Sequence, residues 1–182
     1  MRRLYNRNFN EEAKDNAERK YAYSFDFDVM HPFMLKSFQP FLTPGNALEL
    51  GSFRGAFTKR LSQIFDDITC VEASVEAFRA AKGELRDKAS FINDVFEKVV
   101  LDRKFDNIFM THVLEHLDDP VLVLKRVNGE WLSDKGRFFL VCPNANAPSR
   151  QIAVKMGLIS HNCAVTTSEA QHGHKITYRA CA

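Results

Sequence analysis

ALELGSFRGAFTKRL (residues 47–61) reads as a buried strand, a tight turn and an amphipathic helix in direct succession. Residues 46–50 form the short apolar run, and Gly51 and Gly55 bracket the turn that follows it. The helix then presents apolar side chains at helical spacing, at Phe57, Leu61 and Ile64. The stretch predicts a strand whose carboxyl end leads through glycines into a helix, which is the repeating unit of a parallel α/β sheet.

The same alternation continues along the next eighty residues. Further short apolar runs predict strands at residues 68–71, 90–92, 105–110 and 138–141. Amphipathic helices are predicted between them, with apolar positions at Val75, Phe78 and Ala81 and, after the start signal of residues 118–120, at Val121, Leu124 and Val127. Short strands that alternate with helices indicate an α/β fold with a doubly wound, mostly parallel sheet.

The flanks differ from this central pattern. Residues 1–23 are polar and helix-prone, and an aromatic stretch follows with a helix bounded by Pro32 and Pro40. After residue 144 polar residues accumulate and the alternation weakens. We therefore divide the chain into an N-terminal helical cap or lid (1–43), an α/β core (44–144) and a C-terminal lid segment (145–182).

Composition excludes several classes of protein. The chain has 182 residues, 45% of them hydrophobic and 26% charged, which fits one folded domain. A net charge of +2 is too small to predict a nucleic-acid partner. No apolar run reaches the roughly 18 residues of a membrane span, and the first residues do not resemble a secretory leader. The four cysteines form no closely spaced pair, so we expect a reducing, cytoplasmic location.

Polar residues gather where the predicted strands end. They are residues 49–55, Glu72, Asp94, residues 112–116 and Asn144. Because ligands of such sheets bind outside the carboxyl ends of the strands, we expect these residues to converge on one crevice.

The residue types in this crevice indicate a ligand that carries a nucleoside. The turn at 51–55 lacks the GxGxxG pattern of dinucleotide sites, and the chain has no phosphate-binding GxxxxGK[ST] loop. Glu72 follows the turn by about twenty residues, where an acidic side chain accepts hydrogen bonds from ribose hydroxyls. Asp94, at the next strand end, is placed to accept from an exocyclic amine.

Four motifs, taken in order, resemble the class I S-adenosylmethionine-dependent methyltransferases of the small-molecule branch. ALELGSFRGAFTKRL looks like their first motif, VEAS like the second and FINDVFE like the third, and FDNIFMTHVLEHLDDPVLVLKRV with KGRFFLVCPN resembles their fourth-to-fifth strand region. The resemblance covers residues 45–144. It implies a Rossmann-like methyltransferase fold and an enzyme that transfers a methyl group from S-adenosyl-L-methionine to an oxygen or nitrogen of a small-molecule acceptor.

The resemblance also assigns roles to residues. His116 would act on the acceptor as a catalytic group, since an imidazole titrates near neutrality. The residues expected to bind the cofactor are Glu49, Gly51, Ser52, Gly55, Glu72, Ala73, Asp94, Val95 and Thr111. Glu49 has a second reading as a brace for the glycine turn, and His116 as a packed structural residue.

The chain departs from the family at two places. Ser52, Phe53 and Arg54 replace the usual small residues of the first loop, and Phe53 would crowd it. Family members end with two further strands in an antiparallel hairpin, whereas 38 residues follow Asn144 here. We therefore expect a sheet without these two strands, and an exposed sheet edge that would pair with another chain.

THVLEHLDDP (residues 111–120) also matches the His-x-x-Glu-His signature of zinc peptidases. That site needs both histidines on one continuous helix, whereas His112 is expected at a strand end. A divalent ion held by His112, Glu115 and His116, with His172 or His174 added, is an alternative to a simple pocket wall. We assign no metal ligand.

Three alternatives stay open. The late segment with His161, His172, His174 and Tyr178 is either an acceptor-recognition region or a polar surface loop. The whole chain is either an enzyme or a non-catalytic module that keeps the crevice without turnover. A nicotinamide-dependent oxidoreductase is disfavoured by the spacing of the glycines.

Overall fold

The computed structural model describes residues 7–12 and 26–165. The elements in chain order are η2 (Asp26–Met30), α3 (His31–Phe38), η3 (Gln39–Phe41), β1 (Ala47–Leu50), α4 (Ala56–Leu61), β2 (Ile68–Glu72), α5 (Val75–Glu84), β3 (Ser90–Asn93), β4 (Phe105–Thr111), η4 (Leu114–His116), α6 (Pro120–Arg126), η5 (Val127–Trp131), β5 (Leu132–Val141) and α7 (Pro148–Lys155). A helix lies between β1 and β2, between β2 and β3 and between β4 and β5, as the sequence predicts, whereas residues 94–104 between β3 and β4 form no helix.

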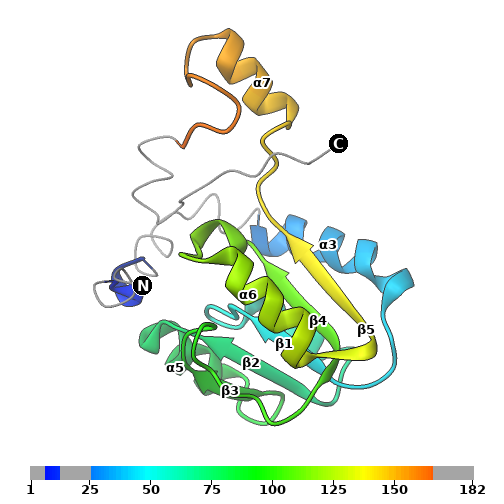
Figure 1. The fold of residues 1–182 in the computed structure, drawn as a ribbon. Coiled ribbons are helices and arrows are strands. Elements are labelled where there is room, and N and C mark those ends of the chain that lie inside the picture. Colours follow the sequence, from blue (N-terminus) through cyan, green and yellow to red (C-terminus); the bar gives the residue numbers. More distant parts are fainter. Residues whose placement is uncertain (1–6, 13–25, 166–182) are drawn as a thin grey trace.

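The five strands form one sheet in the order β3-β2-β1-β4-β5 (Figure 1). Every neighbouring pair is parallel, so all five carboxyl ends lie along the same edge. The chain runs outward from β1 to β3 and then returns to β4, which makes the gap between β1 and β4 the topological switch point. The expected doubly wound α/β sheet is confirmed, and its described strands are all parallel.

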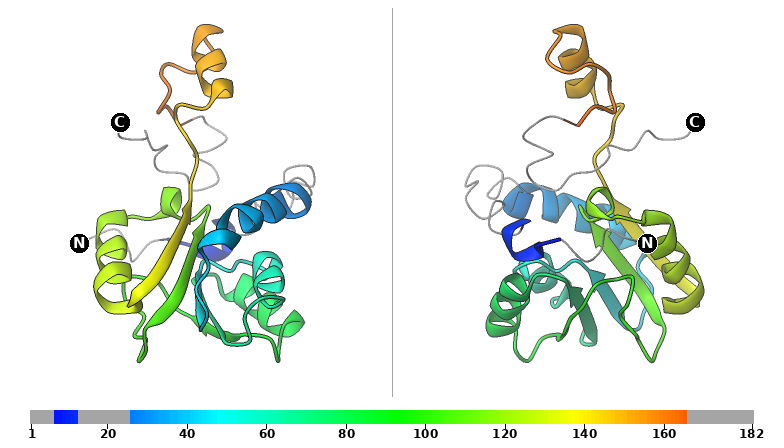
Figure 2. Two further views of the ribbon diagram at one scale, coloured as in Figure 1. Left: turned by 90° about the vertical axis from the view of Figure 1, so that its right-hand side faces the viewer. Right: turned by 60° about the vertical axis from the view of Figure 1, so that its left-hand side comes forward.

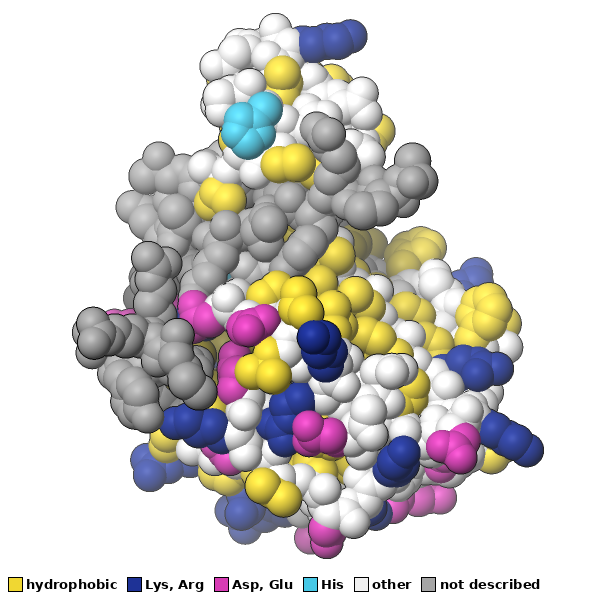
Figure 3. Space-filling model, viewed as in Figure 1, with side chains coloured by type: hydrophobic (Ala, Val, Ile, Leu, Met, Phe, Trp, Pro, Cys, Tyr) yellow, Lys and Arg dark blue, Asp and Glu magenta, His cyan; other side chains and the backbone are white. Residues whose placement is uncertain are grey.

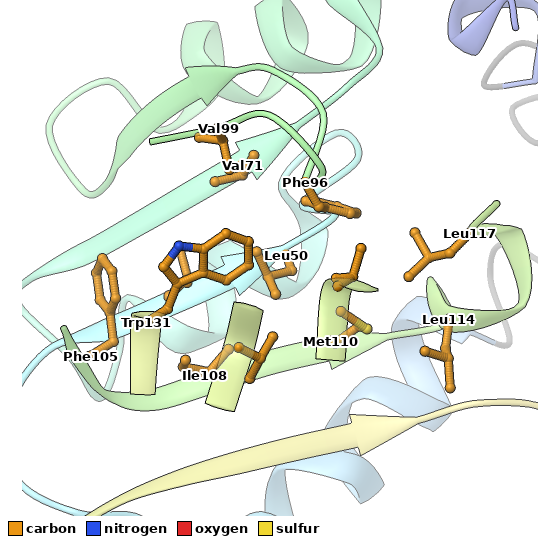
Figure 4. Packing of buried hydrophobic residues seen from close by; sticks show 13 residues of the cluster. Leu50, Val71, Phe96, Val99, Phe105, Ile108, Met110, Leu114, Leu117 and Trp131 are labelled. Carbon is orange, nitrogen blue, oxygen red and sulfur yellow. The ribbon is translucent and has the colours of Figure 1, made fainter. Parts of the chain in front are cut away.

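Helices cover both faces of this sheet (Figure 2). On one face the apolar cluster gathers around Trp131, with Leu48 and Leu50 of β1 and Val123 of α6 (Figure 4). On the other face Phe57 of α4 belongs to a second cluster. Because successive strand residues point to opposite faces, β1 serves both clusters, and all four of its residues are buried.

Helix α3 packs directly on the second face of the sheet. Met34 is only 7% exposed, and the ring of Phe38 lies 4.9 Å from that of Phe139 and 6.0 Å from that of Phe109. The aromatic stretch thus supplies a layer of the core at its α3 end. The division of the chain at residue 43 stays a prediction, and residues 13–25 of the expected cap lie outside the described residues.

Strand β5 begins earlier than its sequence suggests. We predicted its start near Gly136, whereas the strand runs from Leu132. Its pairing with β4 shifts register between Phe105 and Asn107, and a side chain at Gly136 would lie 2.9 Å from the Phe105 carbonyl oxygen. The absence of a side chain at Gly136 therefore lets the backbones of β4 and β5 approach in this irregular stretch. For this reason residues 132–137, which resemble a turn in sequence, belong to the strand.

Two predicted helix faces are also wrong in part. Val121 is 59% exposed, while Val123 is fully buried against the sheet. Ile64 lies beyond the end of α4 and is 44% exposed. Residues 121–124 are all apolar, so helical periodicity alone does not define which side faces the core.

After β5 the chain leaves the body of the molecule and forms α7, which projects away from the sheet (Figures 1 and 2). Ile152, Met156 and Leu158 are more than half exposed there. Within residues 7–12 and 26–165 no strand follows β5, and β5 has a partner on one side only. Pairing of this edge with another chain stays a prediction. Among the helices that the structure describes, none has the length and apolar character of a membrane span.

Candidate active site

The turn after β1 holds two glycines in the left-handed backbone region. Gly51 has φ 84°, and a Cβ atom there would lie 2.4 Å from Cγ2 of Val113, in the loop after β4. Gly55 has φ 85° and lies against α5, where a Cβ would meet Leu85 at 2.9 Å. Both glycines are therefore required by backbone conformation and by close neighbours. The turn is held tightly between the elements on either side of the switch point.

The same turn contains a residue that the family pattern lacks. Phe53 has φ 47°, which is unusual for a residue with a side chain. Ser52 is 3% exposed, and its hydroxyl oxygen has no hydrogen-bond partner. A buried hydroxyl without a partner is costly, so this atom is available to a ligand at the turn.

Glu72, the last residue of β2, binds this turn. Its carboxylate accepts hydrogen bonds from the backbone N–H of Phe53 and of Ser74, both at 2.8 Å. The side chain is 9% exposed, and burial raises the pKa of its carboxyl although the amides of Ser74, Phe53 and Ala73 act in the opposite direction. An ionised carboxylate has about four acceptor sites. The backbone amides therefore occupy much of the hydrogen-bond acceptor capacity of Glu72. The sequence did not predict this use of the side chain.

The end of β3 joins the same cluster. Asn93 donates a hydrogen bond from its side-chain amide to the carbonyl oxygen of Glu72 at 2.7 Å. Asp94 follows directly, is half-buried, and accepts from the N–H of Val95 at 2.8 Å. Ala73, next to Glu72, is also half-buried. The predicted residues of the second and third motifs thus lie at two neighbouring strand ends.

Glu49 points to the other side of β1. Its carboxylate accepts from the hydroxyl of Thr58 in α4 at 2.6 Å and from the thiol of Cys70 at 3.7 Å. Glu49 is 2% exposed, and burial raises the pKa of its carboxyl to about 7, with a smaller contribution from Glu72. Among its hydrogen bonds between described residues, those with Thr58 and Cys70 tie β1 to α4 and to β2. This geometry fits the brace that the sequence left open, and the cofactor role of Glu49 stays a prediction.

Across the switch point, β4 ends at the half-buried Thr111, and the chain then bends sharply. His112 has φ 55°, and its N–H donates to the carbonyl oxygen of Val141 in β5 at 2.8 Å. Glu115 follows in η4 with 1% exposure, and His112 Nδ1 lies 3.7 Å from its Oε1. His112 lies outside η4, so the two histidines of the motif do not share the single helix that a zinc peptidase needs.

His116, the predicted catalytic residue, ends η4 and is half-buried. Its backbone carbonyl oxygen accepts a hydrogen bond from the Arg7 guanidinium at 2.8 Å. Arg7 also contacts the carboxylate of Asp118 at 3.3 Å. The structure thus places His116 at the predicted strand end, and its role in catalysis stays a prediction.

Residues 7–12 cross between the loops that follow β2 and β4, a contact that the sequence did not predict. Arg7 reaches the loop after β4, and the Asn10 side-chain oxygen accepts from the Ser74 hydroxyl at 3.0 Å and from the Glu76 N–H at 3.3 Å. No motif or spacing in the sequence indicates these partners, because they lie more than sixty residues away.

The remaining candidates lie in the C-terminal part of the chain. Asn144 is exposed, and its side chain accepts from the N–H of Asn146 within its own turn. His161 is exposed, and His172, His174 and Tyr178 lie outside the described residues. Within the part of the chain that the structure describes, no three His, Cys, Asp or Glu side chains are arranged to hold a metal ion. On the face seen in Figure 3, basic and acidic side chains are interspersed.

The sequence is similar to a known protein family. A family model described as "Methyltransferase domain" matches residues 8–179. No curated protein sequence matches the chain.

Solved structures share its fold. The DhpI–SAH complex is 23% identical with a TM-score of 0.61, and the match covers 71% of this chain and 64% of that one. The plantazolicin methyltransferase BamL, in complex with a triazolic desmethylPZN analog and SAH, is 20% identical with a TM-score of 0.62, over 88% of this chain and 58% of that one. An S-adenosylmethionine-dependent methyltransferase from Clostridium acetobutylicum is 22% identical with a TM-score of 0.56, over 68% and 56%. The chain therefore spans less than two thirds of the length of each of these three proteins.

Proposed function

The chain belongs to the methyltransferase-domain family, and from this premise we propose that it is an enzyme that uses S-adenosyl-L-methionine to methylate an oxygen or nitrogen of a small-molecule acceptor. The observation that carries the proposal is the convergence at the sheet edge. Gly51, Glu72 and Asn93 come from three strand ends and are connected by contacts of the turn, while Val113 packs on Gly51 from across the switch point.

The residues present fit the cofactor. The hydroxyl of Ser52, which has no partner among the described residues, offers a polar group at a turn that Gly51 and Gly55 hold close to Val113 and Leu85. We assign the remaining acceptor capacity of Glu72 to a ribose hydroxyl, and the second oxygen of Asp94 to the adenine amine. The other assigned residues line the neighbouring strand ends and are Ala73, Val95 and Thr111.

When bound, S-adenosyl-L-methionine supplies a methyl group on a positively charged sulfur, and the lone pair of the acceptor forms the new bond to carbon as the carbon–sulfur bond breaks. The chain contributes position above all, since holding two reactants in line accounts for much of such a rate enhancement. We assign His116 to receive the proton of the acceptor.

The acceptor lies, in this proposal, over the ends of β4 and β5. The described strand ends there carry imidazole, carboxylate and thiol side chains, namely His112, Glu115 and Cys142. Because the plantazolicin methyltransferase BamL was solved with a triazolic desmethylPZN analog, triazolic compounds are a second acceptor class to screen. The cytoplasm is our proposed location.

A second candidate function is the non-catalytic module. It is favoured by Phe53, whose N–H occupies Glu72 and whose bulk stands where the family has small residues. Methyl transfer from S-adenosylmethionine to an acceptor separates the two, and titration calorimetry tests the cofactor site on which both depend. A protein with the cofactor site should give a heat of binding with S-adenosylmethionine and with S-adenosylhomocysteine at micromolar ligand. The absence of any heat of binding at millimolar ligand would exclude a cofactor site.

Glu72→Gln sharpens the test. The variant keeps one acceptor oxygen but presents an amide group to backbone N–H donors, so we expect S-adenosylhomocysteine to bind at least about tenfold more weakly. Glu84→Gln is the matched control, because Glu84 pairs with Lys59 on the surface of α5. Equal affinity of both variants would contradict the assigned role of Glu72.

A further inference from the structure

Glu115 is a buried carboxylate whose charge is not compensated. It is 1% exposed, and neither of its side-chain oxygens has a hydrogen-bond partner in the part of the chain that the structure describes. Buried carboxylates are ordinarily paired or hydrogen-bonded, because desolvation of the charge is expensive. A residue in this state within an active-site edge indicates that its partner arrives with a ligand.

Among residues 7–12 and 26–165, no Lys or Arg forms an ion pair with Glu115. His112 Nδ1, at 3.7 Å from Oε1, is beyond hydrogen-bond distance, and His112 Nε2 is also buried without a partner. Burial raises the pKa of the Cys142 thiol, and the nearby Glu115 carboxylate raises it further. The carboxylate is therefore close to the end of β5 as well as to the end of β4.

His112 is held in an uncommon conformation beside this carboxylate. Its φ of 55° is disfavoured for residues with side chains, and its N–H is fixed by the carbonyl oxygen of Val141. Burial lowers the pKa of His31 in α3 to about 4, with smaller contributions from Arg60 and His112. One imidazole and one carboxylate thus lie close together where the chain leaves β4 beside the end of β5.

This group lies on the opposite side of the switch point from Glu72. Glu72 and Asn93 end β2 and β3, whereas His112 and Glu115 follow β4, and the contact of Val113 with Gly51 joins the two halves. A ligand bound by the turn and Glu72 would therefore have Glu115 on its far side, toward β5.

We propose that Glu115, together with His112, binds the acceptor through a basic amine nitrogen, so that the substrate class of the enzyme is an amine. This inference rests on the proposed function. A carboxylate only accepts hydrogen bonds, and an ammonium group offers both N–H donors and the opposite charge. A neutral hydroxyl acceptor would provide one donor and leave the charge of Glu115 uncompensated.

The same residues account for the proton and the charges of the methyl transfer. The amine binds in its protonated form and passes one proton to the Glu115 carboxylate, which for an amine acceptor takes the role assigned above to His116, and this frees the nitrogen lone pair. The lone pair forms the bond to the methyl carbon, the carbon–sulfur bond breaks, and its electron pair stays on sulfur. The sulfur loses its positive charge, and the methylated nitrogen, next to Glu115, carries a positive charge instead.

The test compares two ligands that differ in charge at the methyl position. Sinefungin carries an ammonium group where S-adenosylmethionine carries its methyl, and S-adenosylhomocysteine carries nothing there. We expect the wild-type protein to bind sinefungin about tenfold or more tightly than S-adenosylhomocysteine, measured by calorimetry. In Glu115→Gln this preference should disappear, while the affinity for S-adenosylhomocysteine changes by no more than about twofold.

The outcomes distinguish a failure of the amine site from a failure of the proposed function. If S-adenosylhomocysteine does not bind the wild-type protein, the proposed function fails and the amine site with it. If it binds but the wild-type protein shows no preference for sinefungin, or if Glu115→Gln keeps the preference, the amine site is overturned and the methyltransferase proposal survives. A neutral, hydroxyl-binding site gives that second result.

Two further variants guard the interpretation. Glu84→Gln removes the same charge from the surface of α5 and should leave the preference unchanged. His112→Asn keeps a residue type that tolerates positive φ but removes the imidazole, and it should weaken sinefungin more than S-adenosylhomocysteine. If Glu115→Gln does not fold by circular dichroism, the wild-type comparison and His112→Asn still decide the question.

Discussion

At the scale of single residues, Glu49 makes the stability of the protein depend on pH. Burial raises the pKa of its carboxyl from the ordinary 4.5 to about 7. Below pH 4.5 the group is protonated in both the folded and the unfolded chain. As the pH rises toward 7 the unfolded chain ionises first, so Glu49 costs progressively more stability until it ionises in the folded state too.

We therefore expect the free energy of unfolding of Glu49→Gln to rise relative to that of the wild type between about pH 4.5 and pH 7, by an amount on the order of 3 kcal/mol. Urea unfolding of both proteins at several pH values measures it. A difference in the free energy of unfolding that does not vary with pH would contradict the raised pKa.

Gly51 is the residue whose backbone the turn depends on most. Gly51→Ala places a Cβ at positive φ and 2.4 Å from Cγ2 of Val113, so we expect a loss of about 2 kcal/mol in the free energy of unfolding and weaker cofactor binding. Gly83→Ala is the matched control, because Gly83 lies within α5 with nothing within 4 Å of the added atom. That variant should be stabilised by about 0.5–1 kcal/mol. Equal effects of the two changes in chemical denaturation would argue against strain at Gly51.

At the scale of elements, the start of α6 was predicted correctly from its residues. The Asp119 side chain accepts a hydrogen bond from the N–H of Leu122 at 2.9 Å, and Pro120 occupies the first turn. Local chemistry determines such a cap, so the sequence is enough to find it. The face of α6 and the start of β5 depend instead on neighbouring elements, and there the prediction was wrong.

Asp119→Ala should lower the free energy of unfolding by about 1 kcal/mol, because the N–H of Leu122 loses its acceptor. Thermal unfolding followed by circular dichroism is a sufficient measurement. Val121→Ala provides the control in the same helix, since Val121 is 59% exposed, and it should be nearly neutral. A larger loss for Val121→Ala than for Asp119→Ala would mean that the helix packs with a different face.

At the scale of the whole molecule, residues 7–12 connect loops that are far apart in the chain. Arg7 is the main contact, with hydrogen bonds to the His116 carbonyl oxygen and to Asp118 as well as to Glu12. Its guanidinium is 13% exposed, and hydrogen bonds and charge from Glu12 and Asp118 outweigh burial and raise its pKa.

We expect Arg7→Ala to release this segment while leaving the sheet intact. Hydrogen exchange at the amide of Glu12, which donates to the Asn8 carbonyl oxygen, should accelerate about tenfold, whereas amides of β1 should keep their protection. Lys59→Ala, which breaks an exposed pair with Glu84, should leave the Glu12 amide unchanged. Unaltered exchange at Glu12 in Arg7→Ala would show that Arg7 does not hold the segment.

The sequence by itself determined the succession of strands and helices, the parallel sheet, and the edge at which Gly51, Glu72 and Asp94 lie. These follow from apolar periodicity and from the rule that parallel strands end on one side, and both are local properties. Only the tertiary structure decided that Glu72 binds the N–H of Phe53, that Glu49 faces Thr58 and that Glu115 is buried without a partner. Periodicity states which face a residue occupies, whereas a hydrogen bond depends on distances between atoms that are brought together only when the helices have packed.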